Sequence, residues 1–222
     1  MKTSIEEKKK YIESGSQISA ELHALNPAYI LDCGACDGLD SIIYSRMFPE
    51  AIIYAIEAVT DNYNELIDNI TEFGCKNVNP GRFCLSDCIE SIKFYLSHGD
   101  SGTKKDWDTG NKSSSILKPA KHLDEHPWCK FYEDRTTTTR FDSLGIPRID
   151  YIHLDVQGAE LKVLRGMGTV LDTVKMVWME VATVELYEGQ PLKTDVEGFM
   201  RAAGFALKYD STRRFGDQLW IR

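Results

Sequence analysis

The sequence has 222 residues, of which 42% are hydrophobic, and its formal net charge of -8 makes a nucleic acid an unfavourable partner, because binding a phosphate backbone requires a basic face. The composition is sufficient for one substantial core and excludes disordered and fibrous proteins. Because no apolar run approaches the roughly 20 residues that span a bilayer and no signal peptide is recognisable, we expect a cytoplasmic protein with no membrane partner.

The first part of the chain predicts a helical lead-in followed by alternating strands and helices. Apolar residues at helical spacing over residues 5–25 indicate one or two amphipathic helices, so residues 1–27 are expected to precede the main domain. Short apolar runs at 28–33 and 51–58 are typical of strands covered on both faces. Each run is followed by a helical pattern, the second of which ends at Gly74, a C-capping glycine.

The middle of the chain contains further strand-like runs and one long polar stretch. Residues 81–87 fit a third strand, and 91–98 a short fourth one. The polar stretch from about 99 to 130 is too long for an ordinary connection in a compact domain, and we expect a lid or substrate-binding loop there. The β-branched residues at 135–141 again indicate a strand.

The last part of the chain completes an α/β pattern. We expect strands at 149–156 and 175–182, each followed by a helix. Two alternating runs at 205–209 and 218–222 flank a turn-rich loop and predict an antiparallel hairpin. Alternating strands and helices indicate a parallel sheet with right-handed crossovers. The predicted fold is therefore α/β: one domain over residues 28–222, with a mostly parallel sheet that ends in the hairpin.

The stretch ILDCGACDGLDS (30–41) ends a strand, turns through two glycines and starts a helix. In open α/β sheets the ligand crevice lies beyond the carboxyl ends of the strands, so this turn faces it. Gly34 and Gly38 let the backbone approach a ligand closely, and the following helix N-terminus attracts an anionic group. Their spacing lacks the third glycine of the dinucleotide fingerprint, so a carboxylate fits better than a diphosphate.

Two strand-end acids predict the rest of the ligand. Asp32 would face an ammonium group, and Glu57, which ends the next strand, would accept both hydroxyls of a ribose. Together with a carboxylate at the Gly34 turn, these groups match S-adenosylmethionine. Taken one at a time, glycine turns and strand-end acids are also ordinary features of α/β folds.

Cys33 and Cys36 in the same turn allow three interpretations: metal ligands, a redox pair, or small filling residues. The pair has no second C-x-x-C to complete a zinc site, and a thioredoxin-like pair opens a helix with a differently built turn. Filling is therefore the favoured interpretation, and all six cysteines are expected to be reduced.

Several motifs together resemble the FkbM-type S-adenosylmethionine-dependent methyltransferases. They are LDCGACDGLDS, YAIEAV, FCLSD, SSSIL, TTTTRFDSL, IDYIHLDVQGAELKVLRGM and VWMEVATVELYEG, spread over roughly residues 28–190. The stretch LDVQGAELKVLRGM is the most specific of them, whereas the glycine turn is shared by most class I methyltransferases. The resemblance implies a seven-stranded, Rossmann-like class I fold that acts mostly on hydroxyl oxygens, often of sugars.

The same resemblance assigns residues to the cofactor. Those that would hold it are Asp32, Gly34, Ala35, Gly38, Ser41, Glu57 and Ala58. Ser86 and Asp87 would lie beside its adenine, and Ser114 or Ser115 would close over it. This chain has Gln157 where the family commonly carries Glu, which puts in doubt any role of a carboxylate at that position as base or metal ligand.

Methyl transfer to a hydroxyl requires in-line geometry and benefits from a base that takes the proton. Asp155, at the carboxyl end of its strand, is the first candidate base, and it could equally be a helix N-cap. His153 projects on the same side of that strand, either as a second base or as a core histidine. Glu180 would orient the substrate hydroxyl or form a salt bridge at its strand end. These three residues could also bind Mg²⁺, an interpretation that we do not favour.

The predicted function is that of an S-adenosylmethionine-dependent O-methyltransferase acting on a hydroxyl of a sugar, a glycan or a similar small molecule. Trp107 and Trp128 in the polar stretch could stack on a sugar ring. Two alternatives remain: a methyltransferase that acts on nucleic acid or protein, and a non-catalytic module that binds S-adenosylmethionine. The sequence carries no readable code for the identity of the acceptor or for an oligomeric state.

Overall fold

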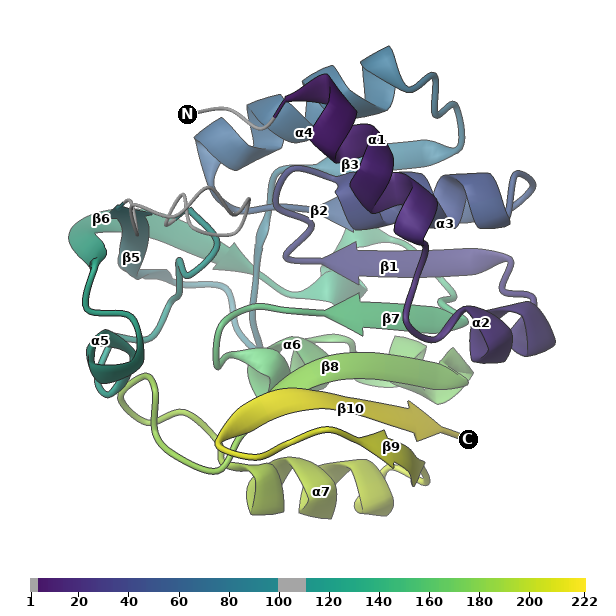
Figure 1. The fold of residues 1–222 in the computed structure, drawn as a ribbon. Coiled ribbons are helices and arrows are strands. Elements are labelled where there is room, and N and C mark those ends of the chain that lie inside the picture. Colours follow the sequence, from purple (N-terminus) through teal and green to yellow (C-terminus); the bar gives the residue numbers. More distant parts are fainter. Residues whose placement is uncertain (1–3, 100–110) are drawn as a thin grey trace.

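A seven-stranded sheet forms the centre of the computed structural model, which describes residues 4–99 and 111–222 (Figure 1). The strand order is β3-β2-β1-β7-β8-β10-β9. The strands are β1 (Tyr29–Cys33), β2 (Ile52–Ile56), β3 (Val78–Gly81), β7 (Tyr151–Leu154), β8 (Met176–Ala182), β9 (Ala206–Asp210) and β10 (Phe215–Ile221). The pairings from β3 to β8 are parallel, and β10 runs antiparallel to both β8 and β9. The predicted α/β fold, a mostly parallel seven-stranded sheet ending in an antiparallel hairpin, is confirmed.

Helices cover both faces of this sheet. On one face lie α1 (Ile5–Ser14), α2 (Ser19–Leu25), α3 (Leu39–Met47) and α4 (Thr60–Glu72). On the other lie α6 (Glu160–Gly166), the 3-10 helices η2 (Phe141–Leu144) and η3 (Gly168–Thr173), and α7 (Lys193–Ala202). Because side chains alternate along a strand, Ile30 enters the first core and Leu31 the second. Among the described residues, no helix combines the length and apolar character needed to cross a bilayer.

A second, three-stranded sheet lies at the carboxyl ends of β1 and β7 (Figure 1). It consists of β4 (Cys84–Leu85), β5 (Ser91–Gly99) and β6 (Cys129–Thr139), with β5 and β6 antiparallel. The predicted polar stretch lies between these two strands. Its residues 100–110, including Trp107, lie outside the described residues, and the described part leads into the short helix α5 (His122–Glu125).

The third strand differs from its prediction. In place of residues 81–87, the main sheet contains β3 at Val78–Gly81. Of the predicted run, only Gly81 lies in this strand, and Cys84–Leu85 forms a strand of the second sheet. Pro80 lies within β3, paired with Ala55. A proline is compatible with this position because β3 is an edge strand and needs no N–H donor toward a further neighbour.

Candidate functional site

A cavity of about 280 Å³ opens at the carboxyl ends of β1, β2 and β7. Its polar wall comes from the turns that follow these three strands, and residues 111, 112 and 114–116 of the polar stretch also line it. Its apolar lining includes Phe83, Leu85, Phe94 and Ile116. One space therefore joins polar strand ends to an apolar pocket, as expected for a small-molecule site.

The Gly34 turn is fixed by close packing between strand ends. Gly34 has φ +83°, and a Cβ there would lie 1.8 Å from the carbonyl oxygen of Asp155. The N–H groups of Gly34 and Ala35 both donate to the carbonyl of Ile56, at 2.9 and 3.0 Å. Gly38 is needed for a different contact, because its Cβ would lie 2.9 Å from the Leu66 side chain on α4. Only the first glycine therefore shapes the cavity itself.

Glu57 holds the two loops that form the cofactor side of the cavity. Its Oε2 accepts a hydrogen bond from the Cys36 N–H at 2.8 Å, and its Oε1 accepts one from the Val59 N–H at 2.6 Å. The residue is 6% exposed, and burial raises the pKa of its carboxyl to about 7 against these hydrogen bonds. A carboxylate has further lone pairs, so Glu57 can still accept hydrogen bonds from a ligand in the cavity.

Glu160 does the same for the loop after β7, a role that the sequence did not suggest. Its Oε1 accepts hydrogen bonds from the N–H groups of Val156 and Gly158, at 3.2 and 3.1 Å. Burial raises the pKa of the Glu160 carboxyl to about 7. This loop carries Asp155 and Gln157, both of which line the cavity.

Asp32 and Ser41 lie behind the cavity wall and support His153. Asp32 is 1% exposed, accepts a hydrogen bond from Ser41 Oγ at 2.5 Å, and lies 3.0 Å from Nδ1 of His153 through its other oxygen. Burial opposes protonation of His153, but the hydrogen bond to Asp32 and nearby carboxylates outweigh it and raise its pKa to about 9. At neutral pH His153 is therefore protonated. It can donate hydrogen bonds at the cavity wall, but it has no free ring nitrogen to accept a proton.

Two of the three predicted catalytic residues, Asp155 and His153, line the cavity. Asp155 is exposed, and its Oδ1 accepts a hydrogen bond from Nε2 of Gln157 at 2.6 Å. Glu180, the third, is not among the residues that line the cavity, and it faces Asp217 across the β8–β10 pairing. Burial, together with the charges of Asp155, Glu160 and Asp217, raises the pKa of Glu180.

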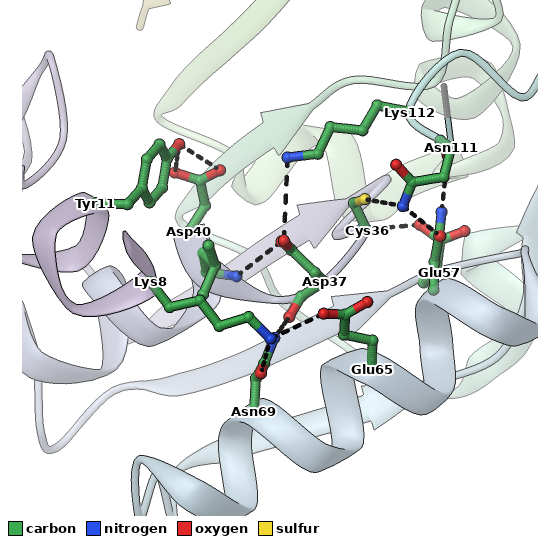
Figure 2. A network of polar contacts seen from close by, with 12 residues as sticks. Lys8, Tyr11, Cys36, Asp37, Asp40, Glu57, Glu65, Asn69, Asn111 and Lys112 are labelled. Carbon is green, nitrogen blue, oxygen red and sulfur yellow. Dashed lines mark hydrogen bonds and ion pairs between the residues drawn. The ribbon is translucent and has the colours of Figure 1, made fainter. Parts of the chain in front are cut away.

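Residues 111–117, which we call the roof segment, lie along the cavity and contact several other parts of the chain. Ser115 exchanges two backbone hydrogen bonds with Tyr95 of β5, at 2.8 and 3.0 Å, and its Oγ donates to the Gln157 carbonyl at 2.7 Å. The Asn111 amide donates to the Asn62 side chain on α4 at 2.9 Å. Figure 2 shows Asn111 and Lys112 pointing toward the turn that follows β1, which we call the first turn. Lys112 lies 4.0 Å from Asp37 in that turn. Ser114 and Ser115 line the cavity.

Helix α1 is attached to the other side of the first turn (Figure 2). Lys8 is 7% exposed, and its ammonium group donates to Glu65 and Asn69 of α4, at 2.8 and 2.9 Å. The Asn69 amide in turn donates to the Asp37 carbonyl at 2.7 Å. The lead-in helix therefore helps to hold the turn, and its Tyr11 also lines the cavity.

The structure brings only part of the predicted set to the cavity wall. The predicted residues that line it are Gly34, Ala35, Glu57, Ala58, Ser115, His153 and Asp155. Those that lie away from the wall are Asp32, Gly38, Ser41, Ser86, Asp87 and Glu180. Asp87 accepts a hydrogen bond from Ser86 Oγ and pairs with Lys162 on α6 at 3.5 Å. The wall at this point is formed by Phe83, Cys84 and Leu85 instead.

Among the described residues, no three His, Cys, Asp or Glu side chains are arranged to hold a metal ion. All six cysteines are free thiols. Burial raises the pKa of the Cys33 and Cys36 thiols well above the usual value, which agrees with a filling role in the turn.

Comparison with known proteins identifies the family. A model described as the methyltransferase FkbM domain matches residues 32–207. The chain belongs to the FkbM methyltransferase family, as its motifs predicted, and it is a methyltransferase. It is 32% identical to 2-O-methyltransferase NoeI of Sinorhizobium fredii (strain NBRC 101917 / NGR234) over 183 residues, which cover 80% of this chain and 72% of that protein. It is 24% identical to methyltransferase sdnD of Sordaria araneosa over 209 residues, 87% of this chain and 79% of that protein.

Solved structures show the same fold at low sequence identity. Methyltransferase FkbM from Methylobacillus flagellatus KT aligns with a TM-score of 0.58 and 12% identity over 97% of this chain, which spans half the length of that protein. Magnesium protoporphyrin IX methyltransferase (ChlM) from Synechocystis PCC 6803 with bound SAM aligns with a TM-score of 0.50 and 13% identity, over 97% of this chain and 79% of that one. The fold is therefore the Rossmann-like class I methyltransferase fold.

Proposed function

We propose that this FkbM methyltransferase transfers the methyl group of S-adenosylmethionine to a hydroxyl of a sugar, a glycan or a similar small molecule. The observation that carries the proposal is the cavity at the strand ends, which brings Glu57, the Gly34 turn and Asp155 around one space. The name of the NoeI relative, a 2-O-methyltransferase, supports oxygen as the acceptor atom.

The cofactor side of the cavity fits S-adenosylmethionine. Glu57 offers carboxylate lone pairs to a ribose diol, while Phe83 and Leu85 offer apolar surface to an adenine. Asp40 lines the cavity and is better placed than the buried Asp32 to face the ammonium of the methionine part. When bound, this cofactor supplies a methyl group on a positively charged sulfur. The surrounding carboxylates favour the binding of that positive charge.

The acceptor side of the cavity favours an uncharged hydroxyl compound. The exposed carboxylate of Asp155 lies at the wall, with Glu180 and Asp217 nearby on β8 and β10. Carboxylates accept hydrogen bonds from hydroxyl groups and repel phosphate and sulfate groups. Nucleic acids and other polyanions are therefore poor candidates, in agreement with the net charge of the chain.

In this proposal Asp155 is the base that accepts the proton of the substrate hydroxyl as the new bond to the methyl carbon forms. Gln157 holds its carboxylate through the 2.6 Å hydrogen bond. The roof segment excludes water from the reacting groups and places the acceptor opposite the methyl group. His153, protonated at neutral pH, remains a donor on the same wall.

The test measures cofactor binding first and transfer second. Calorimetry should show S-adenosylmethionine binding to the wild type, and labelled cofactor should methylate neutral glycosides in preference to their sulfated or phosphorylated counterparts, with RNA and unrelated protein as further acceptors. Parallel reactions with a chelator test for a need for Mg²⁺. Failure to bind the cofactor, or transfer only to RNA or protein, would overturn the proposal, and binding without any transfer would indicate a non-catalytic module. Cytoplasmic location stays a prediction, and the oligomeric state is to be measured separately.

A further inference from the structure

Gln157 lies at the cavity wall and contacts three separate parts of the chain. Its Nε2 donates to Oδ1 of Asp155 at 2.6 Å, and its Oε1 accepts a hydrogen bond from the Tyr187 hydroxyl at 2.8 Å. Its backbone carbonyl accepts the 2.7 Å hydrogen bond from Ser115. Gln157 has φ +54°, a left-handed conformation that is unfavourable for a residue other than glycine unless its surroundings fix it.

Tyr187 connects Gln157 to the polar stretch that covers the cavity. Tyr187 is 1% exposed, and its hydroxyl oxygen also lies 2.9 Å from the Ser113 carbonyl, so its one proton is shared between that carbonyl and Oε1 of Gln157. The next residue, Glu188, donates its N–H to the Lys118 carbonyl at 2.8 Å, so the backbone continues the contact. Burial raises the pKa of Tyr187, which keeps its hydroxyl protonated and able to donate.

We propose that Gln157 is a positioning residue that ties the Asp155 carboxylate to the roof segment, so that one side chain both orients the base and holds the cover of the cavity. This rests on the proposed function, in which Asp155 accepts the proton. An amide fits both partners because it presents a donor and an acceptor on one planar group. A glutamate at 157 could accept from Tyr187, but it could not donate to Asp155 and would place a second negative charge beside it.

The first test follows the cover of the cavity in two variants and a matched control. Gln157→Glu keeps the size of the side chain, and Tyr187→Phe removes only the hydroxyl; Gln17→Glu makes the same charge change at an exposed position outside the cavity. Release of S-adenosylhomocysteine, followed by stopped flow, should become about 5- to 30-fold faster in Tyr187→Phe, as expected for the loss of one buried hydrogen bond, and should change much less in Gln157→Glu, which still accepts from Tyr187. Amide hydrogen exchange over residues 111–117 should rise in Tyr187→Phe, and the Gln17→Glu control should match the wild type.

The second test follows the base, using an acceptor found in the glycoside panel. Gln157→Glu should lower kcat by about 10-fold or more while the KM for the acceptor changes much less, as expected for a lost transition-state interaction. In an Asp155→Asn background the same change should cost no further activity, because its partner has already been removed.

The outcomes separate this inference from the proposed function. A wild type that binds no S-adenosylmethionine overturns the proposed function and this inference with it. An active wild type whose Gln157→Glu variant keeps full kcat, or loses activity additively with Asp155→Asn, overturns only the role of Gln157. If thermal unfolding shows that Gln157→Glu does not fold, the test uses Tyr187→Phe. A Tyr187→Phe variant with the product release and the roof-segment exchange of the wild type would overturn the inference.

Discussion

The contact between His153 and Asp32 predicts a raised pKa for His153, and one substitution at Asp32 should abolish that rise. The two side chains lie 3.0 Å apart, and their exposed fractions are 18% and 1%. The hydrogen bond and the nearby carboxylates raise the pKa of His153 to about 9, although burial acts in the opposite direction. Asp32→Asn removes the charged partner while keeping its size. With burial then dominant, the pKa of His153 should fall to its usual value of 6.5 or below.

The magnitude follows from linkage between protonation and folding. A rise from 6.5 to about 9 corresponds to roughly 3 kcal/mol of folding free energy at about 1.4 kcal/mol for each pKa unit. Because the folded state holds the proton more tightly, this stabilisation is fully present below pH 6.5. It is lost as the pH rises through 9. The contribution of His153 to the free energy of unfolding should therefore decrease by about that amount between pH 6 and pH 10, measured as the difference in pH dependence between the wild type and Asp32→Asn.

Two measurements check this reasoning. Histidine NMR titration, assigned with a His153→Gln variant, reports the pKa directly, and urea unfolding at pH 6 and pH 10 reports the stability. Asp68→Asn, at an exposed position on α4, is the matched control and should keep the wild-type behaviour. A wild-type His153 that titrates near 6.5, or an Asp32→Asn variant with an unchanged His153 titration, would refute the electrostatic account.

Three further predictions concern the cofactor side and the packing around it. Glu57→Gln replaces an oxygen that accepts from a backbone N–H by a donor, so calorimetry should show about 10- to 100-fold weaker S-adenosylmethionine binding; an affinity within twofold of wild type would contradict the assignment. Gly34→Ala places a Cβ 1.8 Å from a carbonyl oxygen and should cost more than about 3 kcal/mol in urea unfolding, whereas Gly189→Ala, at φ +72° in open space, should cost only about 1 kcal/mol. Lys8→Met breaks a buried ion pair and should cost about 3 kcal/mol, while Lys118→Met, in an exposed pair, should leave Tm nearly unchanged; equal effects would remove the buried pair from the argument.

The main sheet could be predicted because its strands carry strong local patterns. Continuous apolar runs over β1, β2, β7 and β8 identify strands buried on both faces, and the final alternating runs identify the hairpin. Two strands of the second sheet were predicted as well, at 91–98 and 135–141, but their pairing with each other in a separate sheet was not. Its β4 has two residues, and β5 and β6 pair across a long intervening segment. A two-residue strand and a pairing between distant segments leave no local periodicity to detect.

The candidate site was predictable at positions that directly follow the last residue of a strand. Glu57 and Asp155 follow the last residues of β2 and β7, and both line the cavity as expected. Asp32 lies inside β1, on the same face as Ile30, and therefore points into the layer between the sheet and α3. There Ser41 and His153 occupy both of its oxygens. Tyr11 reaches the cavity from a helix that is distant in sequence, and no local pattern marks such a contact.

The two loops that form the walls of the cavity are held in the same way. As a result, the stability of the fold and the rigidity of the site are expected to respond differently to pH. Cys36 and Gln157 are non-glycine residues in left-handed conformations, and a buried glutamate holds each loop, Glu57 on one side and Glu160 on the other. Because burial raises the pKa of both glutamates to about 7, protonation below pH 7 relieves buried charge and stabilises the folded chain. The same protonation weakens the acceptors that fix the strained loops. Mild acid should therefore favour the fold while loosening both walls of its cavity.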